Sequence, residues 1–319
     1  MIGAVASAIL IYGIALLYLA TGSIDLTTVG IGLGLVTTPA RVGILGGALV
    51  TVGLAFKVAA VPFHVWTPDV YQGSPTNVTA FMAAATKAAA FAVILRVFTR
   101  AFGSLEATWI PVLAVIAAAT MILGALGALV QRDVKRILAY SSIAHVGYGL
   151  VCVVSASERG IASTLWYLLT YAVTAVGAFG CVIAIERRRR GEVALVDLRG
   201  LGRTAPALAI VFALCLLSLA GIPGTAGFMG KFAVFSAGAQ ADLDWLVVVG
   251  VLSSAVAAFY YLRLMGLMFL EDPPEDAREP VLSTGLMAGV AAAAAFVSVL
   301  GILPGSILDL ADRAASLAR

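Results

Sequence analysis

The sequence SLAGIPGTAGFMGKFAVF, at residues 218–235, interrupts a long apolar segment with a run of glycine and proline beside one lysine. Proline removes a helical hydrogen bond and clashes with the preceding turn, so a helix should break here. FKVAAVPFHVWTPDVY, at residues 56–71, repeats the pattern with Pro62, Pro68 and Lys57. In lipid, protein or water must satisfy the backbone groups that a break frees, so each break predicts a polar interior. A packing kink without a transport role is the alternative.

The composition indicates that lipid surrounds most of the chain. Of its 319 residues, 61% are hydrophobic and only 12% are charged, which a soluble domain could not cover with a polar surface. Several stretches without Asp, Glu, Lys or Arg exceed the roughly 20 residues that a helix needs to span a bilayer. The charge-free stretches are 1–24, 107–131, 137–157, 160–185, 204–230, 245–262 and 280–308. Abundant alanine and leucine favour helices over a barrel.

Hydropathy predicts an all-α polytopic membrane protein of about nine transmembrane helices. The expected segments are 2–21, 41–66, 76–101, 109–131, 137–156, 160–186, 205–240, 244–270 and 281–304. Residues 1–319 form a single transmembrane domain, and the two segments with breaks are 41–66 and 205–240. The first segment has no basic start and no small-residue cleavage site, so we interpret it as a membrane helix and not as a signal peptide.

Basic residues predict the orientation, because cytoplasmic loops are enriched in Lys and Arg. One side carries Arg132, Lys135, Arg136, residues 187–190, Arg199, Arg203 and Arg278. The other carries Arg41, Arg96, Arg100, Arg159, Arg313 and Arg319. The first side carries ten basic residues and the second side six, so the first side is expected in the cytoplasm. The N-terminus is then cytoplasmic and the C-terminus external.

Three lysines stand alone in apolar segments: Lys57, Lys87 and Lys231. A lysine at mid-span costs roughly 2.5–3.5 kcal/mol on insertion scales, which ordinary packing does not offset. A structural ion pair is the alternative, but the candidate acids Asp69 and Glu186 lie at segment ends. A buried lysine can release its proton near neutral pH, whereas arginine stays protonated. The pattern therefore predicts a proton path.

The two histidines and one further lysine are candidate members of this path. His64 follows Lys57 by seven residues, and His145 lies one helical turn after Ser141 on the same face. Each histidine could relay protons or could be an ordinary hydrogen-bonded core residue. Lys135, at the mouth of a helix, is either a relay member or a positive-inside anchor, and the anchor is favoured.

Other ligand classes find little support in the sequence. Cys152, Cys181 and Cys215 are widely spaced in apolar segments and are expected to be small core residues. The histidines have no metal-binding motif around them. A net charge of +3 is too small and scattered to predict nucleic-acid binding. The lipid bilayer and other membrane proteins are the expected partners.

Three stretches resemble subunit N of the bacterial NADH-quinone oxidoreductases, which is an antiporter-like membrane subunit of respiratory complex I. They are VPFHVWTPDVYQGSPTNVTAFMAAATKAAAF at 61–91, DVKRILAYSSIAHVGY at 133–148 and SLAGIPGTAGFMGKF at 218–232. The likeness runs over the whole chain, including GILPGSILDLADRA at 301–314.

The resemblance implies roles for the candidate residues. Lys57 and Lys231 would be the lysines of the two broken helices, with Lys231 facing the external exit. Lys87 would be the central lysine of the next helix, and His64 and His145 would lie on a polar axis. The family pattern has fourteen helices in two inverted five-helix repeats, so this chain would lack about five helices and have an incomplete first repeat. A glutamate that pairs with the lysine at the Lys57 position would lie in the missing part.

The implied function is proton translocation in a bacterial inner membrane, driven by redox chemistry elsewhere in the complex. The chain itself shows no site for flavin, an iron–sulfur cluster or a nucleotide. FMN, iron–sulfur clusters and quinone are expected in partner subunits. The lysine axis alone fits two alternatives equally well, a cation/proton antiporter complex and a membrane-bound hydrogenase. A purely structural membrane scaffold is a third hypothesis.

Overall fold

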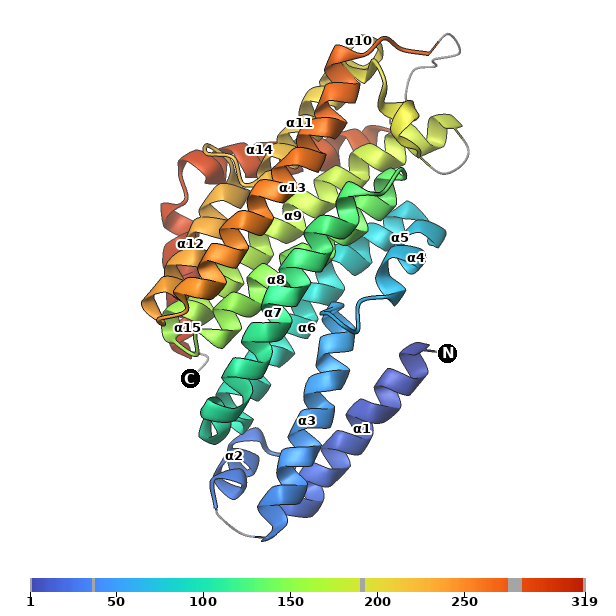
Figure 1. The fold of residues 1–319 in the computed structure, drawn as a ribbon. Helices are drawn as coiled ribbons and strands as arrows, with labels where there is room; N and C mark the ends of the chain where they lie inside the picture. The colour runs from blue at the N-terminus through green and yellow to red at the C-terminus, as the bar shows by residue number, and fades with distance from the viewer. Residues whose placement is uncertain (1, 36–37, 190–192, 275–282, 318–319) are drawn as a thin grey trace.

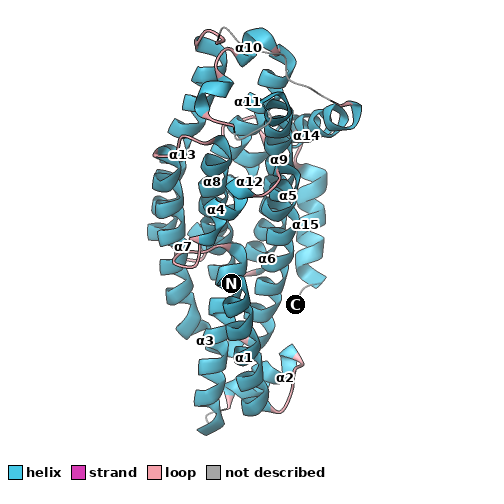
Figure 2. Cartoon of the chain, turned by 90° about the vertical axis from the view of Figure 1, so that its right-hand side faces the viewer, coloured by secondary structure: helices cyan, strands magenta, loops and turns pink. Residues whose placement is uncertain are grey.

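The chain folds as an all-helical bundle. The structure, a computed structural model, describes residues 2–35, 38–189, 193–274 and 283–317. In these ranges the regular structure is helical, apart from one isolated β-bridge between Asp133 and Ala194 (Figure 2). Arg190, Arg278 and Arg319, which entered the orientation count, lie outside the described residues.

Within the described ranges, eight helical segments are long and apolar enough to cross a membrane, and a broken pair corresponds to the remaining predicted segment. The helices that contain these eight spans are α1 (Ile2–Thr21), α3 (Thr38–Val58), α5 (Thr76–Phe81) with α6 (Lys87–Arg96), α7 (Glu106–Leu129), α8 (Val134–Val154), α9 (Glu158–Arg189), α13 (Asp244–Leu270) and α14 (Thr284–Ile302). The broken pair is α11 (Pro206–Ala220) and α12 (Ala226–Gln240). The shorter α-helices are α2 (Leu26–Gly34), α4 (Trp66–Gly73), α10 (Leu201–Thr204) and α15 (Gly305–Leu317). Two π-helical turns, Met82–Thr86 and Val97–Ala101, and two 3-10 turns, Gly103–Leu105 and Leu195–Leu198, are also present. The predicted fold class is confirmed.

Helix α8 forms the centre of the bundle and is almost entirely buried. It packs against α7, α9, α12 and α4, as its middle position in Figure 1 shows. Small residues permit this close packing. At Gly124 of α7, a methyl group would lie 2.8 Å from the Cα of Ala144 in α8. The side chains of α8 therefore point into protein on every face.

Both predicted breaks are present, but they are shorter than the sequence suggested. The first break separates α3 from α4 and contains Pro62, and the second separates α11 from α12. Pro68 lies in the first turn of α4, where a missing backbone N–H costs nothing, and so it does not break the helix. Gly227 and Gly230 likewise lie inside α12.

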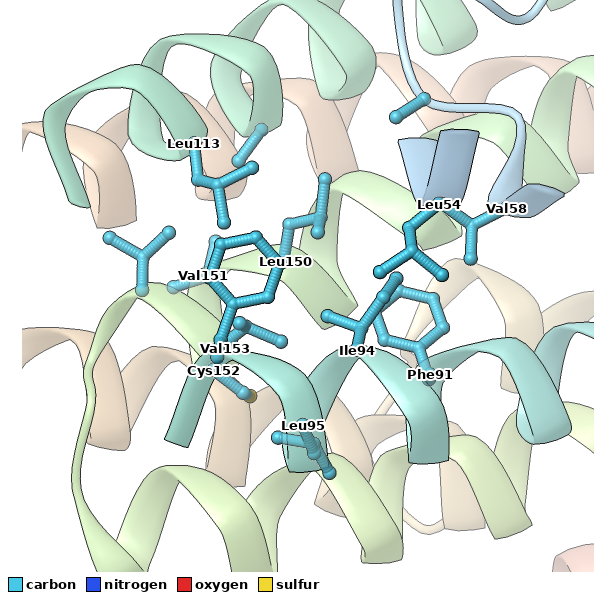
Figure 3. Close-up of a cluster of buried hydrophobic side chains, with 14 of the residues drawn as sticks. Leu54, Val58, Phe91, Ile94, Leu95, Leu113, Leu150, Val151, Cys152 and Val153 are labelled. Atoms are coloured by element: carbon cyan, nitrogen blue, oxygen red, sulfur yellow. The ribbon is translucent and has the colours of Figure 1, made fainter. Parts of the chain in front are cut away.

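An apolar cluster joins α3, α6, α7 and α8 (Figure 3). Leu54 and Val58 of α3 meet Phe91 and Ile94 of α6, with Leu150 of α8 beside them. Cys152 belongs to the same cluster, and all three cysteines are buried with free thiols. The cluster fills the space between the first break and the centre of the bundle with hydrocarbon.

Helix α1 lies at one edge of the molecule and packs chiefly against α3 (Figure 1). Most of its side chains are exposed. The face of α3 around the first break is therefore much less covered than the central helices are.

Candidate functional site

Lys87 lies deep in the bundle, just after a π-helical turn at Met82–Thr86. Such single turns are frequent at functional sites because they rotate the next side chain. Lys87 is 3% exposed, and its Nζ donates to the carbonyl oxygen of Ser142 at 3.0 Å and to the Ser142 hydroxyl. The Tyr71 ring lies 5.9 Å from the same Nζ. In the part of the chain described, its polar partners are neutral.

His145 lies on α8 in a cage of aromatic rings. Its Nδ1 is 2.5 Å from the hydroxyl of Tyr167, and its Nε2 is 3.5 Å from the hydroxyl of Tyr261. The rings of Tyr171 and Tyr148 lie 4.8 Å and 5.6 Å from the imidazole, measured between centroids. A hydroxyl can donate or accept, so each ring nitrogen can hold or yield a proton without losing its partner.

Lys231 fills the second helix break. Its Nζ donates to the carbonyl oxygen of Ala220, the last residue of α11, and to the Ser254 hydroxyl, both at 2.8 Å. The final carbonyls of a helix have no partner within the helix, so the lysine satisfies one that the break frees. The Tyr148 ring lies 5.0 Å from the Nζ. Lys231 is 4% exposed.

These groups lie side by side in one series, which we call the central path. Hydrogen bonds link its first three members, and ring contacts link the rest. The Tyr171 hydroxyl donates to the Ser142 hydroxyl at 2.7 Å, and the Tyr171 ring contacts His145. On the other side of the imidazole, the Tyr148 ring contacts both His145 and Lys231. In order, the central path comprises Lys87, Ser142, Tyr171, His145, Tyr148 and Lys231.

Lys57 is not part of this series. Its side chain is exposed, contrary to the expectation of burial. Among the residues that the structure describes, its Nζ donates one hydrogen bond, of 3.4 Å, to the Ser7 hydroxyl of α1. The carbonyl oxygen of Phe56 at the first break accepts from Trp66 Nε1 at 3.2 Å instead. The apolar cluster of Figure 3 lies between α3 and Lys87's helix.

His64 lies within the first break and is half-buried. Its Nδ1 is buried and has no hydrogen-bond partner among the described residues. The structure thus brings it into hydrogen-bond contact with neither Lys57 nor Lys87. Its role as a relay stays a prediction.

Lys135 is buried at the start of α8 and is held by two partners. Its Nζ lies 3.6 Å from a carboxylate oxygen of Glu186 and donates to the Ser74 carbonyl oxygen at 2.8 Å. The next residue, Arg136, pairs with Asp69 at 2.6 Å. The two acids that were considered as partners for the deep lysines therefore pair with cations at this end of α8.

The tyrosines of the site, together with Ser142 and Ser254, were not predicted from the sequence. Tyr167 and Tyr171 are four residues apart on α9, and Tyr148 follows His145 by three residues on α8. The sequence signal that could have predicted them is a stripe of polar residues with helical spacing inside a charge-free segment. Thr170 and Thr174 extend that stripe on α9.

Known proteins resemble the chain in sequence and in fold. The family described as "NADH:quinone oxidoreductase/Mrp antiporter, TM" matches residues 1–257. NADH-quinone oxidoreductase subunit N of Rhodococcus opacus is 48% identical over 317 residues, covering 99% of this chain and 58% of the relative. Subunit N 3 of Streptomyces griseus is 48% identical over 332 residues, covering 100% and 60%. The chain thus spans about three fifths of the length of these curated relatives.

Two solved structures share the fold. A chain of respiratory complex I from Thermus thermophilus with bound aureothin is 39% identical, with a TM-score of 0.81, over 97% of this chain and 66% of that one. A chain of the Mrp complex from Dietzia sp. DQ12-45-1b is 26% identical, with a TM-score of 0.88, over 99% and 66%. The antiporter-like architecture expected from the sequence is confirmed.

Proposed function

We infer the function from the family, since the chain belongs to the NADH:quinone oxidoreductase/Mrp antiporter transmembrane proteins. We propose that it is a proton-translocating subunit in the membrane arm of an NADH:quinone oxidoreductase. In this proposal the central path carries the proton and Lys231 releases it on the external side. The chain does no redox chemistry itself.

The burial of two lysines and a histidine along the central path carries the proposal. Two buried lysines flank one histidine, and side-chain hydroxyls and aromatic rings fill the spaces between them. A structural role for two buried ammonium groups would favour buried carboxylate partners. Here their hydrogen-bond partners are carbonyl oxygens and serine hydroxyls, which tolerate both the charged and the neutral lysine.

The energy required is modest. Moving one elementary charge against 100 mV takes about 2.3 kcal/mol. That equals a change of fewer than two pKa units at one group, at 1.36 kcal/mol per unit. A change of charge next to one lysine is therefore enough to drive release of its proton.

The sequence identities favour an oxidoreductase over an antiporter. The Mrp chain has the higher TM-score of the two structures but only 26% identity, so the fold alone does not separate the functions. The curated relatives at 48% identity are oxidoreductase subunits N. An antiporter subunit or a membrane-bound hydrogenase subunit remains the second candidate, and sister genes for quinone-oxidoreductase subunits or for antiporter subunits would distinguish them.

The remaining assignments follow from the proposal. The partners would be the other membrane subunits of complex I, and FMN, the iron–sulfur clusters and quinone would bind in other subunits. The chain would reside in the bacterial inner membrane. Lys57 and His64 would contribute at an end of the path, and Lys135 would anchor the start of α8.

Lys231→Ala in the native complex tests the proposal. We expect NADH-driven proton pumping in membrane vesicles to fall, because the variant removes the proton carrier at the second break. Arg263→Ala is the matched control, since Arg263 is exposed and its Nη1 reaches only the Leu129 carbonyl oxygen at 3.4 Å. Pumping and NADH oxidation that both remain at the level of the control would support a structural scaffold and exclude the relay.

A further inference from the structure

An apolar groove lies between α3 and α7 and ends at the first helix break. Its volume is about 340 Å³. Ile44, Ala48 and Ala55 line it from α3, Trp109 and Val112 from α7, and Phe63 closes it at the break. It lies apart from the central path.

The lining selects an apolar occupant. The hydroxyl of Thr51, one of its few polar groups, already donates to the Gly47 carbonyl oxygen at 2.8 Å. A buried water needs two to four polar partners, which this lining does not offer. Both walls are membrane-spanning helices, so the bilayer is the nearest source of an apolar ligand.

The length of the groove matches one leaflet. Ile44 and Ala55 are eleven residues apart on α3, which corresponds to about 16 Å at 1.5 Å per residue. Half of a hydrocarbon core of about 30 Å is about 15 Å. A single acyl chain that enters from one membrane surface would therefore reach the break near the bilayer midplane.

A cation lies about one helical turn beyond the Ile44 end of the groove. Arg41 precedes Ile44 by three residues, so both lie on the same face of α3. Arg41 is exposed, and no ion pair involves it among the residues that the structure describes. By contrast, Arg136, Arg199 and Arg203 each pair with an acidic side chain. A guanidinium at the membrane surface is well suited to bind a phosphate.

We propose that this groove binds one anionic phospholipid, with an acyl chain along α3 and α7 and the phosphate on Arg41. The chain end would then contact Phe63 and support the irregular stretch between Lys57 and His64. The inference does not depend on the proposed function, because it rests on the groove, its length and its charge.

Electron spin resonance with labelled lipids tests the proposal. The chain, purified with its copurifying subunits, is reconstituted into phosphatidylcholine vesicles that contain phosphatidylglycerol with a nitroxide in mid-chain. Ala48→Phe fills the groove and should remove one immobilised phosphatidylglycerol per chain. Leu45→Phe is the matched control, because Leu45 is an exposed neighbour on α3 outside the lining.

Arg41→Gln tests the headgroup separately, and as an exposed position it should leave folding unchanged. The wild type should immobilise labelled phosphatidylglycerol more strongly than labelled phosphatidylcholine, and the variant should hold both equally. Equal immobilisation in Ala48→Phe and Leu45→Phe would overturn the site. The site would also be overturned if the wild-type chain immobilises no lipid there because another polypeptide covers the groove. A preference for phosphatidylglycerol that persists in Arg41→Gln would overturn it as well.

Discussion

At the scale of single residues, His145 differs from a typical core histidine in having a hydroxyl near each ring nitrogen. Tyr167 lies at 2.5 Å from Nδ1 and Tyr261 at 3.5 Å from Nε2. The usual range between a nitrogen and an oxygen is roughly 2.7–3.2 Å, so the first contact is short and the second is long. The asymmetry means that Tyr167 has the larger influence on which nitrogen carries the proton.

Tyr167→Phe should slow NADH-driven proton pumping. A neutral hydrogen bond contributes about 0.5–1.5 kcal/mol, so we expect a roughly two- to tenfold lower rate. The rate would be measured with a pH-sensitive dye in membrane vesicles. Tyr140→Phe is the control. Tyr140 lies on α8, and its hydroxyl makes no hydrogen bond among the described residues. Equal rates in both variants would show that the Tyr167 hydroxyl is not needed.

Lys135→Arg should leave pumping unchanged if Lys135 is an anchor, which is the interpretation that we favour. Arginine keeps the ion pair with Glu186 but stays protonated, so it cannot relay a proton. Lys135→Ala should then reduce the amount of assembled chain in the membrane. A Lys135→Arg variant that assembles normally but pumps poorly would instead assign Lys135 to the relay.

The lysines and histidines could be found from the sequence, whereas their partners could not. A lone lysine in an apolar segment is visible without any structure, because its burial is costly. The partners Ser142, Tyr171 and Ser254 lie on three different helices. Which helix faces meet is decided by packing over the whole bundle. The exposure of Lys57 was missed for the same reason.

At the scale of helices, the backbone groups that the two breaks free find hydrogen-bond partners in different ways. At the second break, Lys231 itself binds the freed carbonyl of Ala220. At the first break, Trp66 binds the Phe56 carbonyl and the Thr120 hydroxyl accepts from Val61 N at 2.9 Å. A lysine therefore binds the freed carbonyl oxygen at the second break only, so we expect the second break to respond more to a change in lysine charge.

Gly221→Ala should destabilise the second break. Gly221 has a φ of +83°, and a methyl group there would lie 2.7 Å from Cδ of Lys231. The left-handed conformation alone costs a non-glycine residue about 1–2 kcal/mol. We expect a lower thermal midpoint in detergent and reduced pumping. Gly289→Ala on α14 is the control, because nothing lies within 4 Å of its added methyl and helix propensity favours alanine.

Equal thermal midpoints in the two glycine variants would contradict this account of the second break. A Gly221→Ala chain that is less stable but pumps normally would show that the strain does not reach Lys231.

The existence of the breaks was predictable, but their extent was not. Pro62 and the Gly221, Pro223 and Gly224 group disrupt helices by local chemistry. Pro68 was expected to do the same, yet its position in the first turn of α4 accommodates it. The π-helical turn at Met82–Thr86 consists mostly of good helix formers, so no local signal predicts it. We therefore attribute this turn to tertiary packing around Lys87.

At the scale of the whole molecule, the bundle has a fully packed centre and an open edge. Helices α8 and α9 are buried on most faces, whereas most side chains of α1 are exposed. Helix α1 lies at one edge of the molecule (Figure 1). The central path lies in the packed part, where low polarity strengthens electrostatic interactions. Lys57 lies at the open edge, where its Nζ contacts the Ser7 hydroxyl of α1.

Cysteine labelling in intact cells tests the orientation that the basic residues predict. Asp272→Cys lies beyond the predicted cytoplasmic end of α13 and should resist a membrane-impermeant maleimide. Asp244→Cys lies at the opposite end of α13 and should react. The wild type is the control, because its three cysteines are buried. Labelling of Asp272→Cys alone would reverse the orientation.

The central claim is that a proton passes from Lys87 to Lys231 through His145. His145→Gln tests it most directly, because glutamine keeps a polar side chain but cannot carry the proton. The measurement is the number of protons pumped per NADH oxidised in vesicles of the native complex. Loss of a proton-transfer group slows its step by roughly 100-fold or more, so we predict a lower ratio. A ratio equal to the wild type, at an equal rate of NADH oxidation, would contradict the account.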